Sequence, residues 1–162
     1  MVDRYVSALV KELKMVAGEL QLRTVFFGGG TPSILSLRHW EKILAAMDDL
    51  GVTEVNEWTV ECNPATLSGD KAKLLKEGGV TRVSMGVQSM DPDLLVRLGR
   101  VHSRDMVYKS YDTLRNTGFE RVNLDLMFAV PGQSMEMWGD TLGEVIAMKP
   151  DHLSCYEVIY EQ

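Results

Sequence analysis

Residues 121–130 read RVNLDLMFAV, and a Pro-Gly pair ends the run. From Leu124 onward nearly every side chain is apolar, whereas a strand with one face in water alternates apolar and polar residues. The run therefore predicts a strand of a parallel sheet that is buried on both faces. Asp125 interrupts it between Leu124 and Leu126, and a buried carboxylate has to be paired, hydrogen-bonded or protonated. Asp125 is thus a candidate site residue, with a purely structural role as the alternative.

The same succession of strand, loop and helix repeats along the rest of the chain. Strands are expected at 23–27, 57–61, 80–87 and 152–158, and helices at 37–50, 66–77, 91–99, 103–117 and 135–148. A first helix is expected to carry Tyr5, Leu9, Leu13 and Val16 on one face. Strands separated by helices of this length need crossover connections, so the strands are parallel. The fold class is α/β with parallel βα repeats, in a single domain over residues 1–162, as a doubly wound sheet or as an arc of a barrel.

The composition excludes several classes of protein. The 162 residues carry 17 Lys and Arg against 23 Asp and Glu, a net charge of −6 with both signs interspersed, so nucleic acid is not expected as a partner. The N-terminal segment lacks the basic and unbroken apolar parts of a signal peptide, and no membrane-spanning stretch is apparent, so we expect a cytoplasmic protein. The only cysteines, Cys62 and Cys155, stand far apart, and we assign no metal site.

Polar residues and glycines stand at the ends of four successive strands. These residues are Gly28, Gly29, Gly30 and Thr31, then Glu61, then Gln88, and finally Asp125. Ligands of parallel βα folds lie outside the carboxyl ends of the strands, so we predict one small-molecule pocket there, with the glycines leaving room for the ligand. Arg100, in LGRVHS, is a further candidate, because its planar guanidinium could clamp a carboxylate. In the alternative interpretation GGGTP is only a tight turn into a helix, Glu61 is a solvated strand end, and Arg100 is a surface arginine after a helix.

Five segments in this order, FFGGGTPS, ECNP, VSMGVQS, LGRVHS and NLDLMFAVPGQ, resemble the radical S-adenosylmethionine (SAM) family of oxygen-independent coproporphyrinogen III oxidases. The LGRVHS segment is more similar to the heme-chaperone branch of that family than to the oxidases. The resemblance covers nearly the whole chain and implies part of a radical-SAM partial TIM-type barrel, which binds SAM and a [4Fe-4S] cluster at the strand C-termini. For the complete protein it implies reductive cleavage of SAM to a 5′-deoxyadenosyl radical, with a porphyrinogen or heme as partner.

Carried onto this sequence residue by residue, the resemblance implies a set of SAM contacts. They are Gly28, Gly29, Gly30, Thr31, Glu61, Gln88, Arg100 and Asp125. The glycines would hold the methionine portion of SAM through backbone groups, while the carboxylates and the amide suit its ammonium and ribose hydroxyls. Arg100 suits the methionine carboxylate. Ile159 is a weaker match, at the place where the family's backbone meets adenine.

The chain departs from the family in one respect. The family holds its cluster with a CxxxCxxC motif on a loop after the first barrel strand, and no such motif occurs in this sequence. The resemblance therefore implies the central part of the barrel, strands two to six, incomplete at both ends and inactive alone. The strand at 23–27 would be an exposed edge, which favours self-association. Two alternatives stay open: a heme-binding module without radical chemistry, and a lyase or aldolase barrel fragment with phosphate at the glycine loop.

Overall fold

The structure, a computed structural model, describes residues 1–51 and 55–159 and contains one curved sheet of parallel strands. The strands are β1 (Thr24–Phe27), β2 (Glu57–Cys62), β3 (Arg82–Gln88), β4 (Arg121–Phe128) and β5 (His152–Glu157). Their order in the sheet is β1-β2-β3-β4-β5, and every neighbouring pair is parallel. Each strand lies beside its neighbour in sequence, as in a βα barrel, whereas the strand order of a doubly wound sheet reverses at a switch point. The predicted α/β class is confirmed, and of the two arrangements the structure is the barrel arc.

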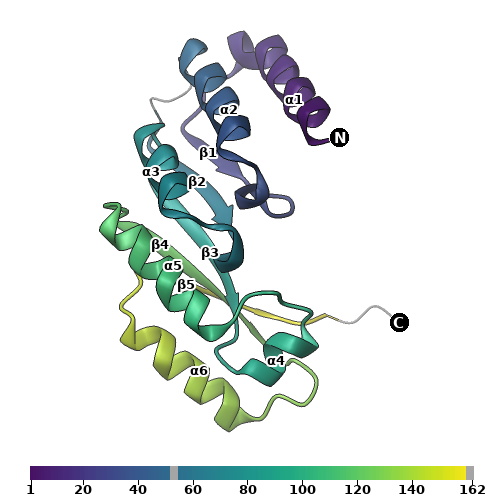
Figure 1. Cartoon of the computed structure of the whole chain (residues 1–162), viewed down its shortest axis with the longest axis vertical. Coiled ribbons are helices and arrows are strands. Elements are labelled where there is room, and N and C mark those ends of the chain that lie inside the picture. The colour runs from purple at the N-terminus through teal and green to yellow at the C-terminus, as the bar shows by residue number, and fades with distance from the viewer. Residues whose placement is uncertain (52–54, 160–162) are drawn as a thin grey trace.

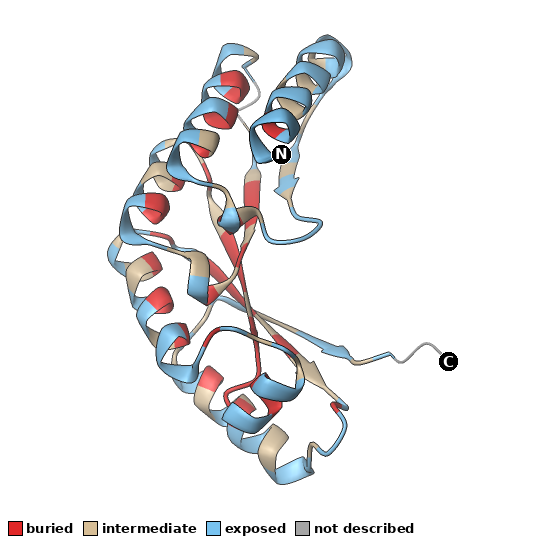
Figure 2. Cartoon of the chain, turned by 45° about the vertical axis from the view of Figure 1, so that its right-hand side comes forward, coloured by how far each residue is buried: buried red, intermediate tan, exposed pale blue. Residues whose placement is uncertain are grey.

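Most helices line the convex side of the sheet, whereas the short helix after β3 lies near the carboxyl ends of the strands (Figures 1 and 2). The described residues form six α-helices. They are α1 (Val2–Val16), α2 (Leu37–Asp49), α3 (Gly69–Glu77), α4 (Pro92–Arg97), α5 (Arg104–Asn116) and α6 (Met135–Ala147), with short 3₁₀ turns η1 (Ala17–Glu19), η2 (Pro32–Ile34) and η3 (Pro64–Thr66). Four of them begin at a serine whose side chain accepts a hydrogen bond from the backbone N–H three residues on, namely Ser36, Ser68, Ser103 and Ser134. Such caps satisfy backbone donors that a helix start leaves free.

The hydrophobic core lies between the sheet and these helices. Alternate residues of the central strands point toward the helices and are fully buried, among them Trp58, Val60, Val83 and Leu124. Residues of the opposite parity face the concave side, where Thr59 and Asn123 are buried and Asp125 is half-buried. The prediction that the fourth strand is buried on both faces is therefore confirmed on the convex face and only partly on the concave face, where Asn123 is buried but Asp125 and Met127 are half-buried.

Several boundaries differ from the predicted ones. The third helix begins at Gly69 rather than residue 66, because η3 forms a separate turn and Ser68 caps the helix. Strand β4 ends at Phe128 rather than residue 130, because Ala129 takes a left-handed backbone with φ 58°.

The face of the first helix that packs on the core is shifted from the predicted one. Tyr5 and Val16 are exposed, whereas Val6 is fully buried. Leu9, Val10 and Leu13 pack beside Val6 at helical spacing, so they form the actual buried face. Among the described residues no helix is long and apolar enough to cross a membrane.

Candidate functional site

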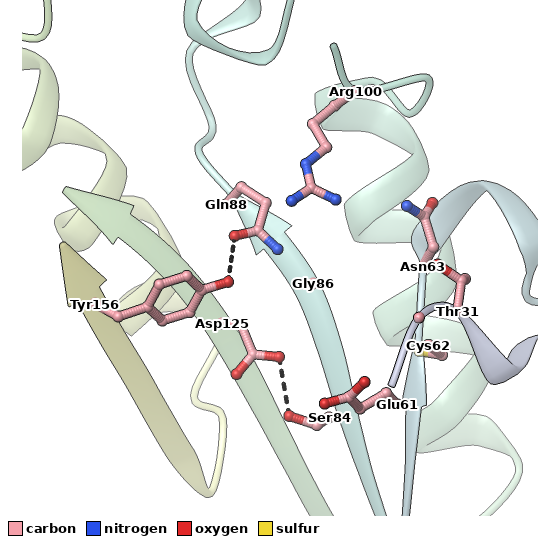
Figure 3. A pocket seen from close by; sticks show the side chains of 11 residues that line it. Thr31, Glu61, Cys62, Asn63, Ser84, Gly86, Gln88, Arg100, Asp125 and Tyr156 are labelled. Carbon is pink, nitrogen blue, oxygen red and sulfur yellow. Dashed lines mark hydrogen bonds between the residues drawn. The ribbon is translucent and has the colours of Figure 1, made fainter. Parts of the chain in front are cut away.

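A polar pocket of about 200 Å³ opens at the carboxyl ends of the strands (Figure 3). It brings together six residues expected from the sequence: Gly30, Thr31, Glu61, Gln88, Arg100 and Asp125. They come from the loop after β1, from β2, β3 and β4, and from the loop after α4. Gly28 and Gly29 lie beside the pocket without lining it, and Ile159 is exposed and away from its lining.

Each of the three glycines has its own structural reason. Gly29 and Gly30 take φ angles of 80° and 141°, a region that residues with a Cβ seldom enter. A Cβ on Gly28 would clash with the Phe26 ring and stand 3.0 Å from the Glu61 carboxyl group. The glycines therefore permit the turn and make room for the Glu61 side chain; that they also make room for a ligand remains a prediction.

The glycine loop is fastened to the loop after β2. The Ser33 hydroxyl lies 2.6 Å from that of Thr66 and accepts a hydrogen bond from the Asn63 backbone N–H at 2.9 Å. Lys71, a buried residue of α3, donates through Nζ to the carbonyl oxygens of Ser33, at 2.5 Å, and of Thr66, at 2.9 Å. Burial lowers the pKa of this ammonium group. One buried lysine thus holds together the two loops that carry Thr31 and Asn63 into the pocket.

Two carboxylates share the concave side of the pocket. Burial raises the pKa of the Glu61 carboxyl above its usual range, and the charge of Asp125 raises it further. A hydrogen bond from the Gly29 backbone partly offsets both effects. The two groups therefore repel each other, and a cation or hydrogen-bond donor between them would relieve that repulsion.

The Asp125 carboxylate is held by its neighbours on the sheet. Ser84 Oγ donates to one oxygen at 2.9 Å, and Asn123 Nδ2 donates to the other at 2.7 Å. Asn123 also donates to Ser84 Oγ at 2.7 Å, while its Oδ1 accepts from Ser154 Oγ at 3.1 Å and contacts His152 Nδ1. This hydrogen-bonded network crosses β3, β4 and β5, so it fixes the carboxylate in one orientation.

Gln88 and Tyr156 form a second polar contact at the pocket. The Tyr156 hydroxyl of β5 donates to Gln88 Oε1 at 2.7 Å (Figure 3). Gln88 is buried and takes a left-handed backbone conformation with φ 68°, next to a register shift in the pairing of β3 with β4. The end of β3 is therefore bent into the pocket, and the side-chain amide of Gln88 is hydrogen-bonded to β5.

Arg100 reaches the pocket from the turn that ends α4. Gly99, with φ 64°, reverses the chain, and the Arg100 backbone N–H donates to the Leu95 carbonyl at 2.9 Å. The Nε atom of Arg100 is buried and has no hydrogen-bond partner among the described residues. His102 donates through Nε2 to the Val87 carbonyl at 3.0 Å, which ties this turn to the end of β3. Burial lowers the pKa of His102 and favours its neutral form.

The sequence reasoning missed several residues of the site. Asn63, Ser84, Gly86 and Tyr156 also line the pocket, as does Cys62. Ser84 and Gly86 precede Gln88 with a period of two, and Tyr156 follows Ser154 in the same way. Strand parity was the signal that could have found them, because residues two apart face the same side of a sheet.

The described residues contain no cluster of three or more His, Cys, Asp or Glu side chains that could hold a metal ion. Cys62 is buried, and burial raises the pKa of its thiol well above the usual range. Cys155 is exposed, on β5. Two such cysteines do not match the three thiolates that the family uses for its iron–sulfur cluster.

The parallel βα arc with a polar pocket at its strand ends matches the barrel that the resemblance implies, and the comparison with protein families agrees. The protein-family model of the Radical SAM superfamily matches residues 2–145, and the chain belongs to that superfamily.

Within this superfamily the chain is similar to heme chaperones and to oxygen-independent coproporphyrinogen III oxidases. The chain is 38% identical over 161 residues to the heme chaperone HemW of Lactococcus lactis, covering 99% of this chain and 42% of that protein. It is 30% identical over 161 residues to the oxygen-independent coproporphyrinogen III oxidase of Bradyrhizobium diazoefficiens, covering 96% of this chain and 36% of that protein. The solved coproporphyrinogen III oxidase HemN of Escherichia coli, a radical SAM enzyme, matches with a TM-score of 0.89 at 25% identity, covering 98% of this chain and 38% of that one. The chain thus spans about two fifths of the length of these relatives.

Proposed function

We propose that this chain forms the SAM-binding part of a radical SAM protein of the HemW and HemN type. One observation carries the proposal: Gly30, Glu61, Gln88, Arg100 and Asp125 converge on one pocket at the carboxyl ends of the strands. The proposal treats residues 1–162 as one central barrel segment of the longer protein. A cytoplasmic location belongs to the same proposal.

The pocket residues fit the chemistry of SAM. Arg100 supplies a planar guanidinium whose buried Nε has no partner among the described residues, which suits the carboxylate of an amino acid. Glu61 and Asp125 supply negative charge for an ammonium group or acceptors for ribose hydroxyls. Gly30, with a φ of 141°, lines the same space and offers its backbone groups to the ligand. When bound, SAM supplies the reactive sulfonium group, and these side chains bind and orient it.

The residues present do not fit a [4Fe-4S] cluster, because the sequence has only Cys62 and Cys155 and lacks the CxxxCxxC motif. We therefore assign no redox step to this chain and expect it to be inactive by itself. The function proposed for the complete protein is heme delivery or porphyrin oxidation, with heme or a porphyrinogen as partner. The higher identity to the heme chaperone and the LGRVHS segment favour heme delivery.

The two other functions have less support. A heme-binding module without radical chemistry would need an accessible ligand, but His102 of LGRVHS is 3% exposed and donates to a backbone carbonyl. A lyase or aldolase of the barrel type would place a lysine or histidine at a strand end, and none lines the described pocket.

Isothermal titration of the chain with SAM tests the proposal. We expect binding, and we expect Asp125→Asn and Gln88→Ala each to weaken it by about tenfold, because each removes a charge-assisted or direct hydrogen bond. Asp112→Asn, at an exposed position of α5, is the matched control and should bind as the parent chain does. A folded chain that binds no SAM contradicts the proposal, and a heme titration with a shifted Soret band in that case supports the heme-binding alternative.

The edge of the sheet leads to a proposal about assembly. In the described part of the chain β1 pairs with β2 alone, and an apolar groove of about 250 Å³ beside it is lined by Leu9, Leu13, Leu22 and Val25 among others. Unpaired strand edges pair readily with other chains. We expect self-association in sedimentation velocity, reduced by Thr24→Lys on this edge. A clean monomer at high concentration would exclude it.

A further inference from the structure

Gln88 ends β3 in a conformation that non-glycine residues seldom take. Its φ is 68°, and the Ser89 N–H donates to the Val87 carbonyl at 2.9 Å, which closes a tight turn around Gln88. The pairing with β4 shifts register between Gly86 and Gln88. Such a backbone persists only where the surrounding contacts hold it.

The turn folds the Gln88 side chain back over Gly86. A Cβ at Gly86 would stand 2.8 Å from Gln88 Nε2, so only glycine leaves room for the amide there. Gln88 is 4% exposed, yet it lines the pocket. The amide therefore has little freedom of position, and what remains undetermined by packing is which of its two ends faces the ligand.

The Tyr156 hydroxyl anchors the Gln88 amide. It donates to Gln88 Oε1 at 2.7 Å, and Figure 3 shows the amide nitrogen on the other side, turned toward the space between Arg100 and Asp125. Among the described residues no hydrogen bond occupies this nitrogen. With the amide reversed, the pocket would receive an acceptor oxygen in addition to the carboxylates of Glu61 and Asp125. A tyrosine hydroxyl can also accept from the amide nitrogen, so the two carboxylates, which favour a donor facing them, set the orientation, while Tyr156 holds the amide in place.

We propose that Tyr156 is a positioning residue that acts through Gln88: its hydroxyl holds the amide in place while the carboxylates of Glu61 and Asp125 keep the amide nitrogen directed into the pocket, and this arrangement selects a ligand with an acceptor oxygen at that point. The acceptor is a hydroxyl or carboxylate oxygen. This inference rests on the proposed function, since it concerns the ligand of the same pocket.

A double-mutant cycle with SAM as the probe tests it. Tyr156→Phe keeps the ring and removes the hydroxyl, and we expect about fivefold to tenfold weaker binding in isothermal titration. The variant Tyr156→Phe/Gln88→Ala should bind no more weakly than Gln88→Ala, because Tyr156 acts through the amide. Tyr108→Phe is the matched control: it removes a hydroxyl that donates to Glu144 at 2.7 Å, between α5 and α6 and away from the pocket. Undiminished binding by Tyr156→Phe, or losses that multiply in full in the double variant, would overturn the proposal.

A measurement without ligand separates this inference from the proposed function. In NMR spectra of the ¹⁵N-labelled chain, the Gln88 side-chain amide should show one fixed orientation, with two well-separated proton shifts. In Tyr156→Phe these shifts should move toward each other, with the backbone spectrum otherwise kept. If SAM does not bind, the proposed function fails while this result still supports the positioning role. An unchanged Gln88 amide in Tyr156→Phe overturns the positioning role whether or not SAM binds.

Discussion

The two faces of the sheet are built for different purposes from the same strands. On the convex face Trp58, Val83 and Leu124 are fully buried under the helices. On the concave face the alternate residues Ser84 and Asp125 hydrogen-bond to each other and line a pocket. Because neighbouring residues of a strand face opposite sides, one strand can stabilise the fold and shape the site with little interference. The predictions below test how separate the two faces are.

The largest expected effect lies on the convex face. Leu124→Ala removes a fully buried side chain from β4, and we expect the free energy of unfolding to fall by about 3 kcal/mol. Chemical denaturation measures this loss, while SAM affinity per folded molecule should stay unchanged. Ile146→Ala, at an exposed position of α6, is the control and should cost well under 1 kcal/mol. A loss of affinity in the folded Leu124 variant would mean that the faces are coupled.

At Lys71 we expect one substitution to affect both the stability of the fold and the binding of SAM. Lys71→Met leaves the carbonyls of Ser33 and Thr66 without their donor, which should cost about 2 kcal/mol of stability and also weaken SAM binding, because the glycine loop is released. Thermal denaturation and titration measure the two effects. Lys73→Met on the same helix is the control: the exposed Lys73 side chain pairs with Glu77, and its loss should change neither stability nor binding. Unaltered binding in the Lys71 variant would show that the loop holds its shape without this lysine.

The smallest expected effect concerns Glu61 on the concave face, where we expect a substitution to change how stability depends on pH. Its folded-state pKa is raised by burial and by Asp125, so the stability that this residue contributes is present at low pH and is lost as pH rises through the raised pKa. Glu61→Gln removes that loss. The stability of this variant relative to the parent chain should therefore increase as pH rises above about 4, where a glutamate carboxyl ordinarily titrates, although SAM binding weakens. Chemical denaturation of both chains at a series of pH values measures this difference in stability. A difference that does not change with pH would contradict a raised pKa of Glu61.

Much of the fold could be predicted from the sequence, because apolar runs such as that around Leu124 and the helix stop signals are local features. The candidate residue Asp125 was found for a similar reason, since it stands alone in an apolar run. Ser84 and Asn123 were missed because small polar residues are common in strands, and their importance depends on the register of β3 with β4.

Other features depend on tertiary structure alone. Lys71 has the sequence context of a surface lysine, and it is buried only because η2 and η3 bring two carbonyls to its ammonium group. The contact of Tyr156 with Gln88 depends on a register shift that has no local sequence signal. The predicted eight-residue set of SAM contacts stays a prediction, although six of its members share the pocket.

The serine caps described for α2, α3, α5 and α6 have an evolutionary consequence. Each of these helices carries its own start signal, so the segment between a strand end and the next helix can gain, lose or exchange residues without moving the helix along its axis. The rim of the barrel can then diversify one loop at a time on an unchanged frame, which suits a superfamily whose members share a scaffold and differ in what they recognise.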